Sequence, residues 1–282
     1  MTSKNQRTAF ILIIIGLFIG CVLFVRAGNP SMPTNITINN NVTSSYPNGT
    51  QLNNTRGFVY NITINESQPT NKWLGYVGNV NGEFALMNSD SEALYDWDII
   101  TITGEVYATK EGPNLSTTGR EDECYNCGMV PNWSNVVCLN SSMLTTEETF
   151  YSHTSTDEDS FSNTFTNGTL FNLTNVFYAG EREVNDTSLP GGASGKCYGT
   201  YLNAADATQY ENWTEVLLTD QTYQWADDSF TTVVWDVIYA VLLENDTIGY
   251  DGNTYDFQIL LPQNGSNGSV NNIAFFFYVE LI

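Results

Sequence analysis

Short runs in which apolar and polar residues alternate fill most of the chain from residue 57 onward. The run 58–64, FVYNITI, alternates in this way, and a half-buried β-strand has the same period of two. Further runs rich in β-branched and aromatic residues occupy 73–88, 95–109, 134–140, 168–180, 196–203, 213–219 and 232–262. Many short strands separated by turn residues are typical of an antiparallel β-sandwich, so we predict an all-β domain over residues 57–282.

Two dipeptides between these runs predict hairpin turns. Asn81-Gly82 and Asp251-Gly252 both tolerate the positive φ angles that a tight two-residue turn requires. The last run, 272–282, is apolar on both faces, so we expect it to lie inside a sheet.

One stretch departs from the β pattern. Residues 145–165, TTEETFYSHTSTDEDSFSNTF, can form a helical turn or two that begins at Thr145 or Thr146, with Glu148 close behind. An acidic surface loop is the alternative that the sequence leaves open.

The N-terminal part is apolar without alternation. Residues 9–25 are seventeen consecutive residues without charge, whereas a signal-peptide core has roughly 7–15. About 17–25 apolar residues span a bilayer, so we predict that residues 1–27 hold a cytoplasmic tip and a single transmembrane helix. Two basic residues precede the run and one follows it, which favours a cytoplasmic N-terminus and an extracellular C-terminal domain.

Three other fates of this run stay open. Cleavage after Ala27 would make it a signal peptide, a lipid on Cys21 would make it a lipoprotein, and a pilin-like leader would make it a filament spine. The pilin alternative has little sequence to continue into, because Pro30 and Pro33 end any helix.

Residues 28–56 are rich in Asn, Thr, Ser and Pro and poor in large apolar residues, which predicts a stalk below the folded domain. The motif Asn-x-Ser/Thr occurs sixteen times in the chain, against roughly six expected by chance. This excess indicates exposure to a glycosylation machinery outside a cell. The candidate acceptors are Asn35, Asn41, Asn48, Asn53, Asn61, Asn65, Asn114, Asn132, Asn140, Asn167, Asn172, Asn185, Asn212, Asn245, Asn264 and Asn267.

The external part is strongly acidic. The chain has 31 acidic and 9 basic residues, and three of the basic ones flank the apolar run, which leaves a formal charge of −25 from residue 28 onward. Such a charge repels phosphate backbones, so we predict that the protein does not bind nucleic acid. Three adjacent acids, Asp157, Glu158 and Asp159, are the candidate ligands for a calcium ion, which prefers several hard oxygens.

Four cysteines lie outside the apolar run. Cys124, Cys127, Cys138 and Cys197 are an even number in an exported domain, which favours two disulfides. We prefer a pairing of Cys138 with Cys197 and a local Cys124–Cys127 loop. A zinc site or a redox-active C-x-x-C pair are the alternatives.

No arrangement of residues predicts catalysis. His153 is the single histidine; it lies in a polar stretch without a nucleophile motif, and we expect it to be solvent-exposed. Carboxylate pairs such as Asp96 and Asp98 can serve glycoside hydrolysis, but an acidic chain contains such pairs by chance. Trp133 and Trp213 belong to sequons and are expected near the surface. Most other aromatic residues are expected in the core, although an aromatic sugar-binding platform is an alternative.

Three segments, KWLGYVGNVNGEFAL, LYDWD with TGEVYAT, and GYDGNTYDFQILLP with FFFYVEL, resemble uncharacterised membrane-anchored surface proteins predicted from archaeal genomes. The resemblance covers most of residues 57–282. It implies an exported, β-rich archaeal protein and transfers no catalytic residue, and the pair Cys124 and Cys127 lies outside the shared pattern.

The sequence therefore predicts a non-enzymatic, membrane-anchored cell-surface glycoprotein with a role in adhesion, cell–cell contact or envelope structure. A pilin-like filament subunit and a carbohydrate-binding or glycan-hydrolysing surface module are the alternatives. The bilayer is the one partner that the sequence predicts directly, through residues 9–25.

Overall fold

The computed structural model describes residues 29–38, 70, 72–88, 93–98, 102–112, 130–166, 177–180, 182–184, 197–202, 213–225, 233–263 and 275–282. Its elements are, in chain order, β1 (Trp73–Gly78), β2 (Glu83–Met87), β3 (Ala93–Asp98), β4 (Gly104–Thr109), the 3₁₀ turn η1 (Trp133–Asn135), β5 (Val137–Cys138), α2 (Ser141–Phe150), α3 (Phe161–Thr164), β6 (Phe177–Ala179), β7 (Arg182–Val184), β8 (Gly199–Tyr201), β9 (Thr214–Trp225), β10 (Val233–Leu242), β11 (Thr247–Ile248), β12 (Thr254–Tyr255), β13 (Phe257–Pro262) and β14 (Phe276–Leu281). Strands dominate and helices are few, which agrees with the all-β prediction.

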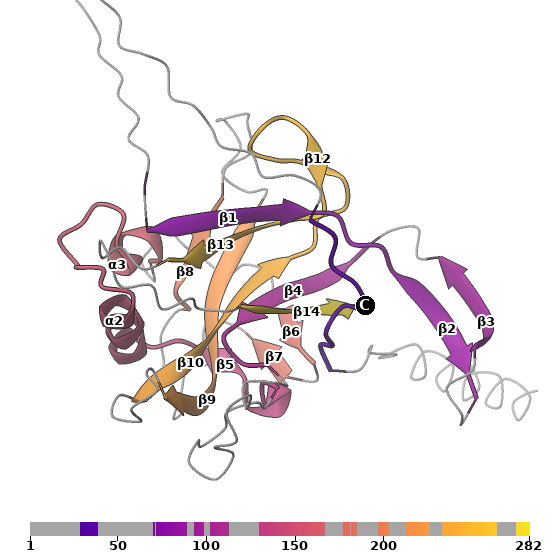
Figure 1. The fold of residues 1–282 in the computed structure, drawn as a ribbon, viewed down its shortest axis with the longest axis horizontal. Helices are drawn as coiled ribbons and strands as arrows, with labels where there is room; N and C mark the ends of the chain where they lie inside the picture. Colours follow the sequence, from indigo (N-terminus) through magenta and orange to yellow (C-terminus); the bar gives the residue numbers. More distant parts are fainter. Residues whose placement is uncertain are drawn as a thin grey trace, which may run out of the picture.

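A six-stranded antiparallel sheet forms the centre of the molecule (Figure 1). Its strands lie in the order β14-β4-β10-β9-β5, and β8 pairs with β9 next to β5. The two long strands, β9 and β10, pair along most of their length and carry the other strands on either side.

Successive side chains of a strand point to opposite faces of a sheet. Each face of this sheet carries its own cluster of buried side chains. Val106, Leu217 and Tyr239 pack on one face with helix α2 and strands β1 and β13. Tyr107, Leu218 and Ile238 pack on the other face with η1, β6 and β7. We call these the α2 face and the η1 face.

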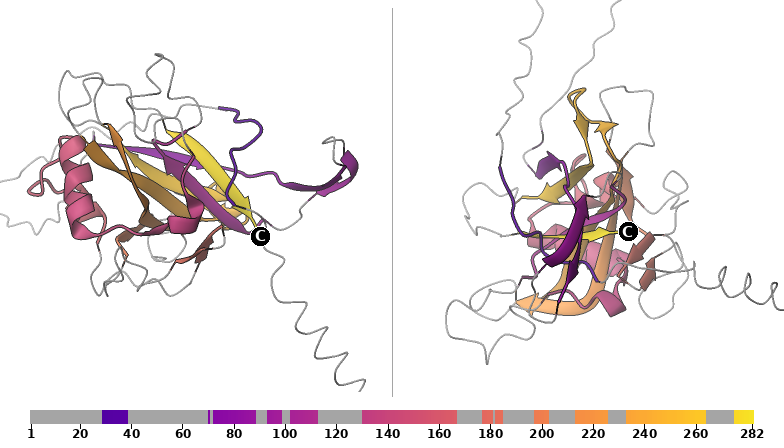
Figure 2. Two further views of the ribbon diagram at one scale, coloured as in Figure 1. Left: turned by 90° about the horizontal axis from the view of Figure 1, so that it is seen from below. Right: turned by 90° about the vertical axis from the view of Figure 1, so that its right-hand side faces the viewer.

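The α2 face is covered by the two-stranded pair β1–β13 and by α2 and α3, which lie at one end of the molecule (Figure 2). Trp73 of β1 packs its ring on Phe161 and Phe165 of the α3 region, and its Nε1 donates to the carbonyl of Asp159 at 2.7 Å. Aromatic packing therefore joins the added strand pair to the helical end.

Helix α2 begins earlier than predicted. Its first residue is Ser141, and Asn140 is the N-cap, whose side-chain oxygen accepts a hydrogen bond from Met143 N at 2.9 Å. The prediction that the helix begins at Thr145 or Thr146 was wrong, because an asparagine oxygen satisfies a free N–H group of the first turn as well as a threonine does.

A buried ion pair fastens α2 to the sheet. Lys110 Nζ lies 2.8 Å from both carboxylate oxygens of Glu147, and Tyr239 donates to the same carboxylate at 3.1 Å. All three side chains are buried. Because each charge is fully paired, the helix can bury both groups without leaving an isolated ion.

The two hairpin predictions had different outcomes. Asp251 and Gly252 do connect the paired strands β11 and β12, and Gly252 has φ 84°. Asn81 and Gly82 do not close a hairpin, because β1 pairs with β13 and β2 pairs with β3. Long-range pairing thus overrides a favourable local turn sequence.

Strand β14 is the last strand in the sheet order rather than an interior one, which corrects the expectation for residues 272–282. Its outer edge is met by the start of the predicted stalk, since Ser31 N donates to Val279 O at 3.0 Å and Val279 N donates to Ser31 O at 2.8 Å. Of the predicted stalk 28–56, residues 29–38 are described, and their first part contacts the sheet instead of standing clear of it.

Among the described residues, no helix is long and apolar enough to span a bilayer. The predicted anchor, residues 9–25, lies outside the described residues, as do Cys124, Cys127, most of the stalk and the strand predicted at 58–64.

Candidate metal centre

Three acidic residues lie side by side on the η1 face, one on each of three neighbouring chain segments. Strand β10 pairs antiparallel with β4 so that Ile238 is opposite Thr109. Two residues before Ile238 and two residues after Thr109, the same register brings Asp236 opposite Glu111. On the other side β10 pairs with β9, with Val237 opposite Thr219, so Asp220 follows next to Asp236. One carboxylate oxygen from each of the three lies within 4.8 Å of the others.

An irregularity in β9 shapes this site. Between the pairs Trp235–Tyr223 and Val237–Thr219, one residue of β10 faces three residues of β9, namely Asp220, Gln221 and Thr222. Gln221 takes the left-handed conformation, with φ 67°. A bulge of this kind redirects side chains, and here the hydroxyl of Thr222 lies among the carboxylates.

Thr222 Oγ1 lies close to all three acids. It is 2.6 Å from Asp220 Oδ1, 3.1 Å from Glu111 Oε1 and 3.1 Å from Asp236 Oδ2. A hydroxyl has a single proton to donate, so at most one of these contacts is a full hydrogen bond. The other contacts bring oxygen lone pairs together.

Within the described part of the chain, backbone donors reach only one of the three carboxylates. Asp220 accepts from Asn132 N at 2.8 Å and from Thr222 N at 2.9 Å. In contrast, no N–H or hydroxyl donor of the described residues reaches Glu111 Oε2 or Asp236 Oδ1, and both atoms are buried. The exposed fractions of Glu111, Asp220 and Asp236 are 1%, 1% and 0%. If all three carboxylates were ionised, their oxygens would therefore need at least one proton or cation between them.

The pKa values reflect this shortage. Burial raises the pKa of Glu111 to about 10, and the nearby charges of Asp236 and Asp220 add to the effect. Burial also raises the pKa of Asp236, to about 7, although a hydrogen bond from Glu111 and the charge of Lys110 act in the opposite direction. Without a metal, a protonated Glu111 can thus donate to Asp236; a bound cation would replace that proton.

The arrangement suits a hard cation better than catalysis. All ligand atoms are oxygens, from three carboxylates and one hydroxyl, which is the set that Ca²⁺, Mg²⁺ and Mn²⁺ prefer. Side chains at or below 1% exposure cannot contact a glycan chain, so this trio cannot act as the acid and base of a glycosidase.

The acidic stretch that the sequence favoured has a different role. The ammonium group of Lys72 binds Asp157 and lies 2.9 Å from Asp159 Oδ1, and Thr154 donates to Asp157. These contacts with Lys72, followed by those with Thr154, lower the pKa of Asp157. Glu158 is exposed. Lys72 thus binds two of the side chains that were expected to bind calcium and offsets one of their charges, and the calcium site there stays a prediction.

His153 is buried, at 4% exposure, which corrects the expectation of an exposed histidine. Its ring packs against Trp73 and Phe161, and its Nε2 lies 3.1 Å from the carbonyl of Gln263. Burial lowers its pKa. Its described ring contacts are all aromatic, with Trp73, Tyr151 and Phe161, so the geometry assigns it to packing.

Both tryptophans that were expected near the surface are buried instead, Trp133 at 4% and Trp213 at 1% exposure. Trp133 packs between Tyr107 and Tyr278 on the η1 face. Asn132, the sequon residue directly before Trp133, is exposed, so adjacent residues here differ completely in burial.

Cys138 and Cys197 form a disulfide, as predicted, with Cα atoms 5.0 Å apart. The sequon residues Asn35, Asn132 and Asn245 are exposed and Asn140 is half-buried; the other candidate acceptors lie outside the described residues. Asp96 and Asp98 are both in β3.

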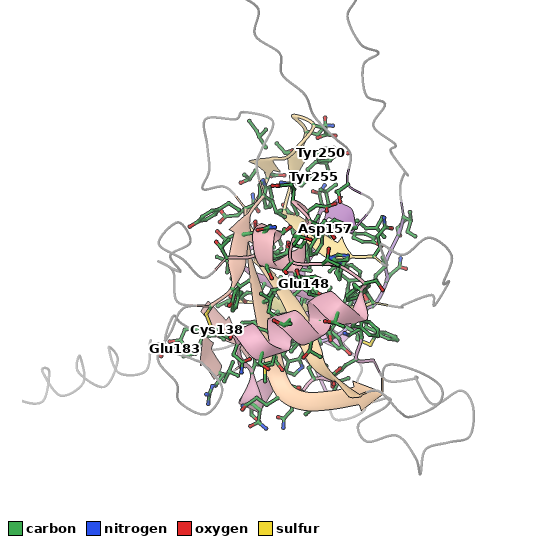
Figure 3. All side chains as sticks on the ribbon, turned by 90° about the vertical axis from the view of Figure 1, so that its left-hand side faces the viewer. Cys138, Glu148, Asp157, Glu183, Tyr250 and Tyr255 are labelled. Carbon is green, nitrogen blue, oxygen red and sulfur yellow. A yellow bond between two sulfur atoms is a disulfide. The ribbon has the colours of Figure 1, made fainter. Side chains whose placement is uncertain are left out.

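A pair of aromatic rings suits the alternative of a sugar-binding surface. Tyr250 and Tyr255 stack with an interplanar angle of 12° at the tip of the β11–β12 hairpin, and Tyr250 is 49% exposed (Figure 3). That alternative stays a prediction.

Sequence reasoning missed Glu111, Asp220 and Asp236. A signal was present, since Asp236 interrupts the apolar run VVWDVIYAVLL and Asp220 follows EVLLT. A lone acid inside an apolar strand indicates a buried carboxylate. The strand register that brings the three together was not readable from the sequence.

No protein-family model, no curated protein and no solved structure matches this chain. The resemblance to archaeal surface proteins therefore stays a prediction.

Proposed function

We propose that this protein is a non-enzymatic, membrane-anchored surface protein whose β-sheet domain binds a divalent cation, Ca²⁺, at Glu111, Asp220 and Asp236. The single observation that carries the proposal is the group of three buried carboxylates, two of which have an oxygen without a hydrogen-bond partner. A β-sandwich in which β1 and β13 begin a second layer over the sheet is part of the same proposal.

The charge balance supports a cation. Three ionised carboxylates in a buried site would be strongly destabilising unless they are protonated or paired. The nearest lysine, Lys110, is already bound by both oxygens of Glu147 on the α2 face. A divalent ion would neutralise two of the three negative charges.

The spacing of the oxygens is compatible with one shared hard cation. Two ligands of one ion lie no farther apart than twice the metal–oxygen distance, which is about 4.6–5.2 Å for Ca²⁺. The three ligand oxygens, all within 4.8 Å of one another, meet this limit.

A buried cation fits a structural role at a cell surface. The ion would join the end of β4 to β10 and to the bulge of β9, and it would be taken up during folding or local opening. Extracellular calcium modules bind at about 10⁻⁴–10⁻³ M, so an acidic surface domain can use an abundant external ion to hold its sheet together.

The test is a calcium titration of the full chain in detergent after removal of metals with EDTA. We expect one site by isothermal titration calorimetry. Calcium at 100 times the dissociation constant should raise the free energy of unfolding by about 2.7 kcal/mol. Glu111→Gln should keep the fold, because glutamine resembles the protonated acid, but should lose both effects.

Glu158→Gln is the matched control, since it removes an acidic side chain that is exposed. It should leave binding and stabilisation unchanged. If Glu111→Gln binds calcium as well as the wild type does, or if Glu158→Gln abolishes binding, the proposed centre is wrong.

A further inference from the structure

The chain just after the predicted anchor contacts one end of the central sheet. Pro30 is buried, and Ser31 forms two backbone hydrogen bonds with Val279 of β14. Asn29 lies against Gly180, where an added Cβ would come within 2.4 Å of its Oδ1. Residues 29–31 thus contact the edge of β14 and the turn between β6 and β7.

The direction of this contact identifies the end of the sheet. Because Ser31 pairs antiparallel with Val279, the residues before Ser31 run toward the end of β14. There Leu281 is opposite Gly104, the first residue of β4, and Ile282 N donates to Thr103 O at 3.0 Å. Figures 1 and 2 show the C-terminus at the opposite end of the molecule from α2.

The tether to the predicted span is short. Four residue steps separate Val25, the last residue of the apolar run, from Asn29, and they reach at most about 14 Å. The headgroup layer on one side of a bilayer is roughly 5–8 Å deep. A span that ends at Val25 therefore keeps Asn29, and the sheet end that holds it, close to the headgroups.

We propose that this end of the sheet, marked by Asn29, Ile282 and the turn between β6 and β7, faces and contacts the phospholipid headgroups. The inference rests on the membrane anchor of the proposed function, and it does not depend on the cation centre.

One exposed cation and two apolar side chains lie at this end, beside the exposed Glu183 and the buried Glu280. The described basic residues are Lys72, Lys110 and Arg182; the first two are in ion pairs and Arg182 is in none. Arg182 is exposed two residues after Gly180, which contacts Asn29. Met32 and Ile282 add apolar surface at 40% and 54% exposure. A cation beside exposed apolar groups is the combination that binds headgroups.

The far end of the molecule is more acidic. The acidic stretch 157–159 lies near α2, and Glu111 is seven residues along from Gly104, or about 23 Å in an extended strand. An anionic lipid surface repels this end. The cation centre is therefore directed away from the membrane, toward external calcium.

Photo-crosslinking of the full chain in phosphatidylcholine vesicles that contain phosphatidylglycerol tests this orientation. A benzoylphenylalanine is placed at Met32, and a second chain carries it at Thr149, an exposed position on α2 that serves as the control. After flotation of the vesicles, lipid adducts are counted by mass spectrometry. We expect an adduct at position 32 and only background at position 149.

The Arg182 side chain is tested in the same vesicles. Arg182→Gln should lower the adduct at position 32 by about fivefold, the factor expected for one basic residue at an anionic surface, and Arg182→Lys should preserve it. Equal adducts at positions 32 and 149, or none at either in protein that floats with vesicles, would overturn the orientation. Protein that fails to float would instead overturn the anchor, and the orientation with it.

Discussion

Glu111 and Glu158 show how burial decides what a carboxylate does. Glu158 is exposed to solvent in an acidic stretch. Glu111 is 1% exposed, and burial together with two neighbouring acids raises its pKa to about 10. The same side chain is thus a solubilising charge at one position and a proton or cation site at the other.

This difference predicts an unusual pH dependence of stability without metal. The pKa of Glu111 is about 10 in the folded protein and near 4.5 when unfolded, so the folded state holds a proton that the unfolded state has released. Its contribution is fully present below pH 4.5 and is lost as the pH rises toward 10. The free energy of unfolding in EDTA should fall by up to about 1.4 kcal/mol per pH unit between pH 7 and pH 10.

Urea unfolding at pH 7, 8 and 9 measures this effect, and Glu111→Gln is the comparison. Other buried acids away from the centre, such as Glu215, contribute equally to both proteins, so the difference between the two curves reports Glu111 together with Asp236, whose pKa depends on it. The burial-lowered pKa of His153 places its effect below this window. Parallel curves for the two proteins would contradict the assignment.

At the scale of elements, β4 connects the proposed membrane end of the sheet with the cation centre. It begins at Gly104, which has φ 140° and lies so close to β14 that an added Cβ would be 1.9 Å from Glu280 O. It ends beside Glu111. The close approach of β4 to β14 thus requires a glycine at the start of β4, and a buried acid lies just beyond its end.

Gly104→Ala should therefore be severely destabilising. The methyl group meets backbone rather than a movable side chain, and the φ angle is strained for alanine, so we expect a loss of more than about 3 kcal/mol. Gly252→Ala is the control, because its φ of 84° is also left-handed but no atom lies within 4 Å of the added Cβ. It should lose only about 1 kcal/mol. Equal losses in chemical denaturation would show that crowding by β14 is unimportant.

At the scale of the whole molecule, the disulfide joins two short strands that lie end to end along β9. Cys138 of β5 is opposite Leu218, and the register of β8, with Gly199 opposite Val216, brings Cys197 to the same place. The bond therefore closes the edge of the sheet on the η1 face.

Removal of this bond should lower stability mainly through the unfolded chain. The two cysteines are 59 residues apart, and a loop of that length corresponds to about 4 kcal/mol in the chain-entropy account. We expect Cys138→Ala with Cys197→Ala to lose about 2–4 kcal/mol in urea unfolding. A loss below about 1 kcal/mol would show that the strands around β9 hold the edge without it.

The sequence by itself determined the strand content and the β11–β12 turn at Asp251-Gly252, and it limited the disulfides to three pairings of four cysteines, of which Cys138 with Cys197 was the preferred one. These features depend on local periodicity, on the φ preferences of glycine and on a small number of cysteines, all of which are written in the order of residues.

Only the tertiary structure decided the partners of β1, the burial of His153 and the gathering of Glu111, Asp220 and Asp236. Glu111 is more than 100 residues from the other two in the chain, and a shift of one residue in strand register would turn any of them to the opposite face. The acids that are adjacent in sequence, Asp157 to Asp159, were the visible cluster, yet Lys72 binds two of them. A site made by strand pairing depends on register, and register is fixed by the packing of the whole sheet.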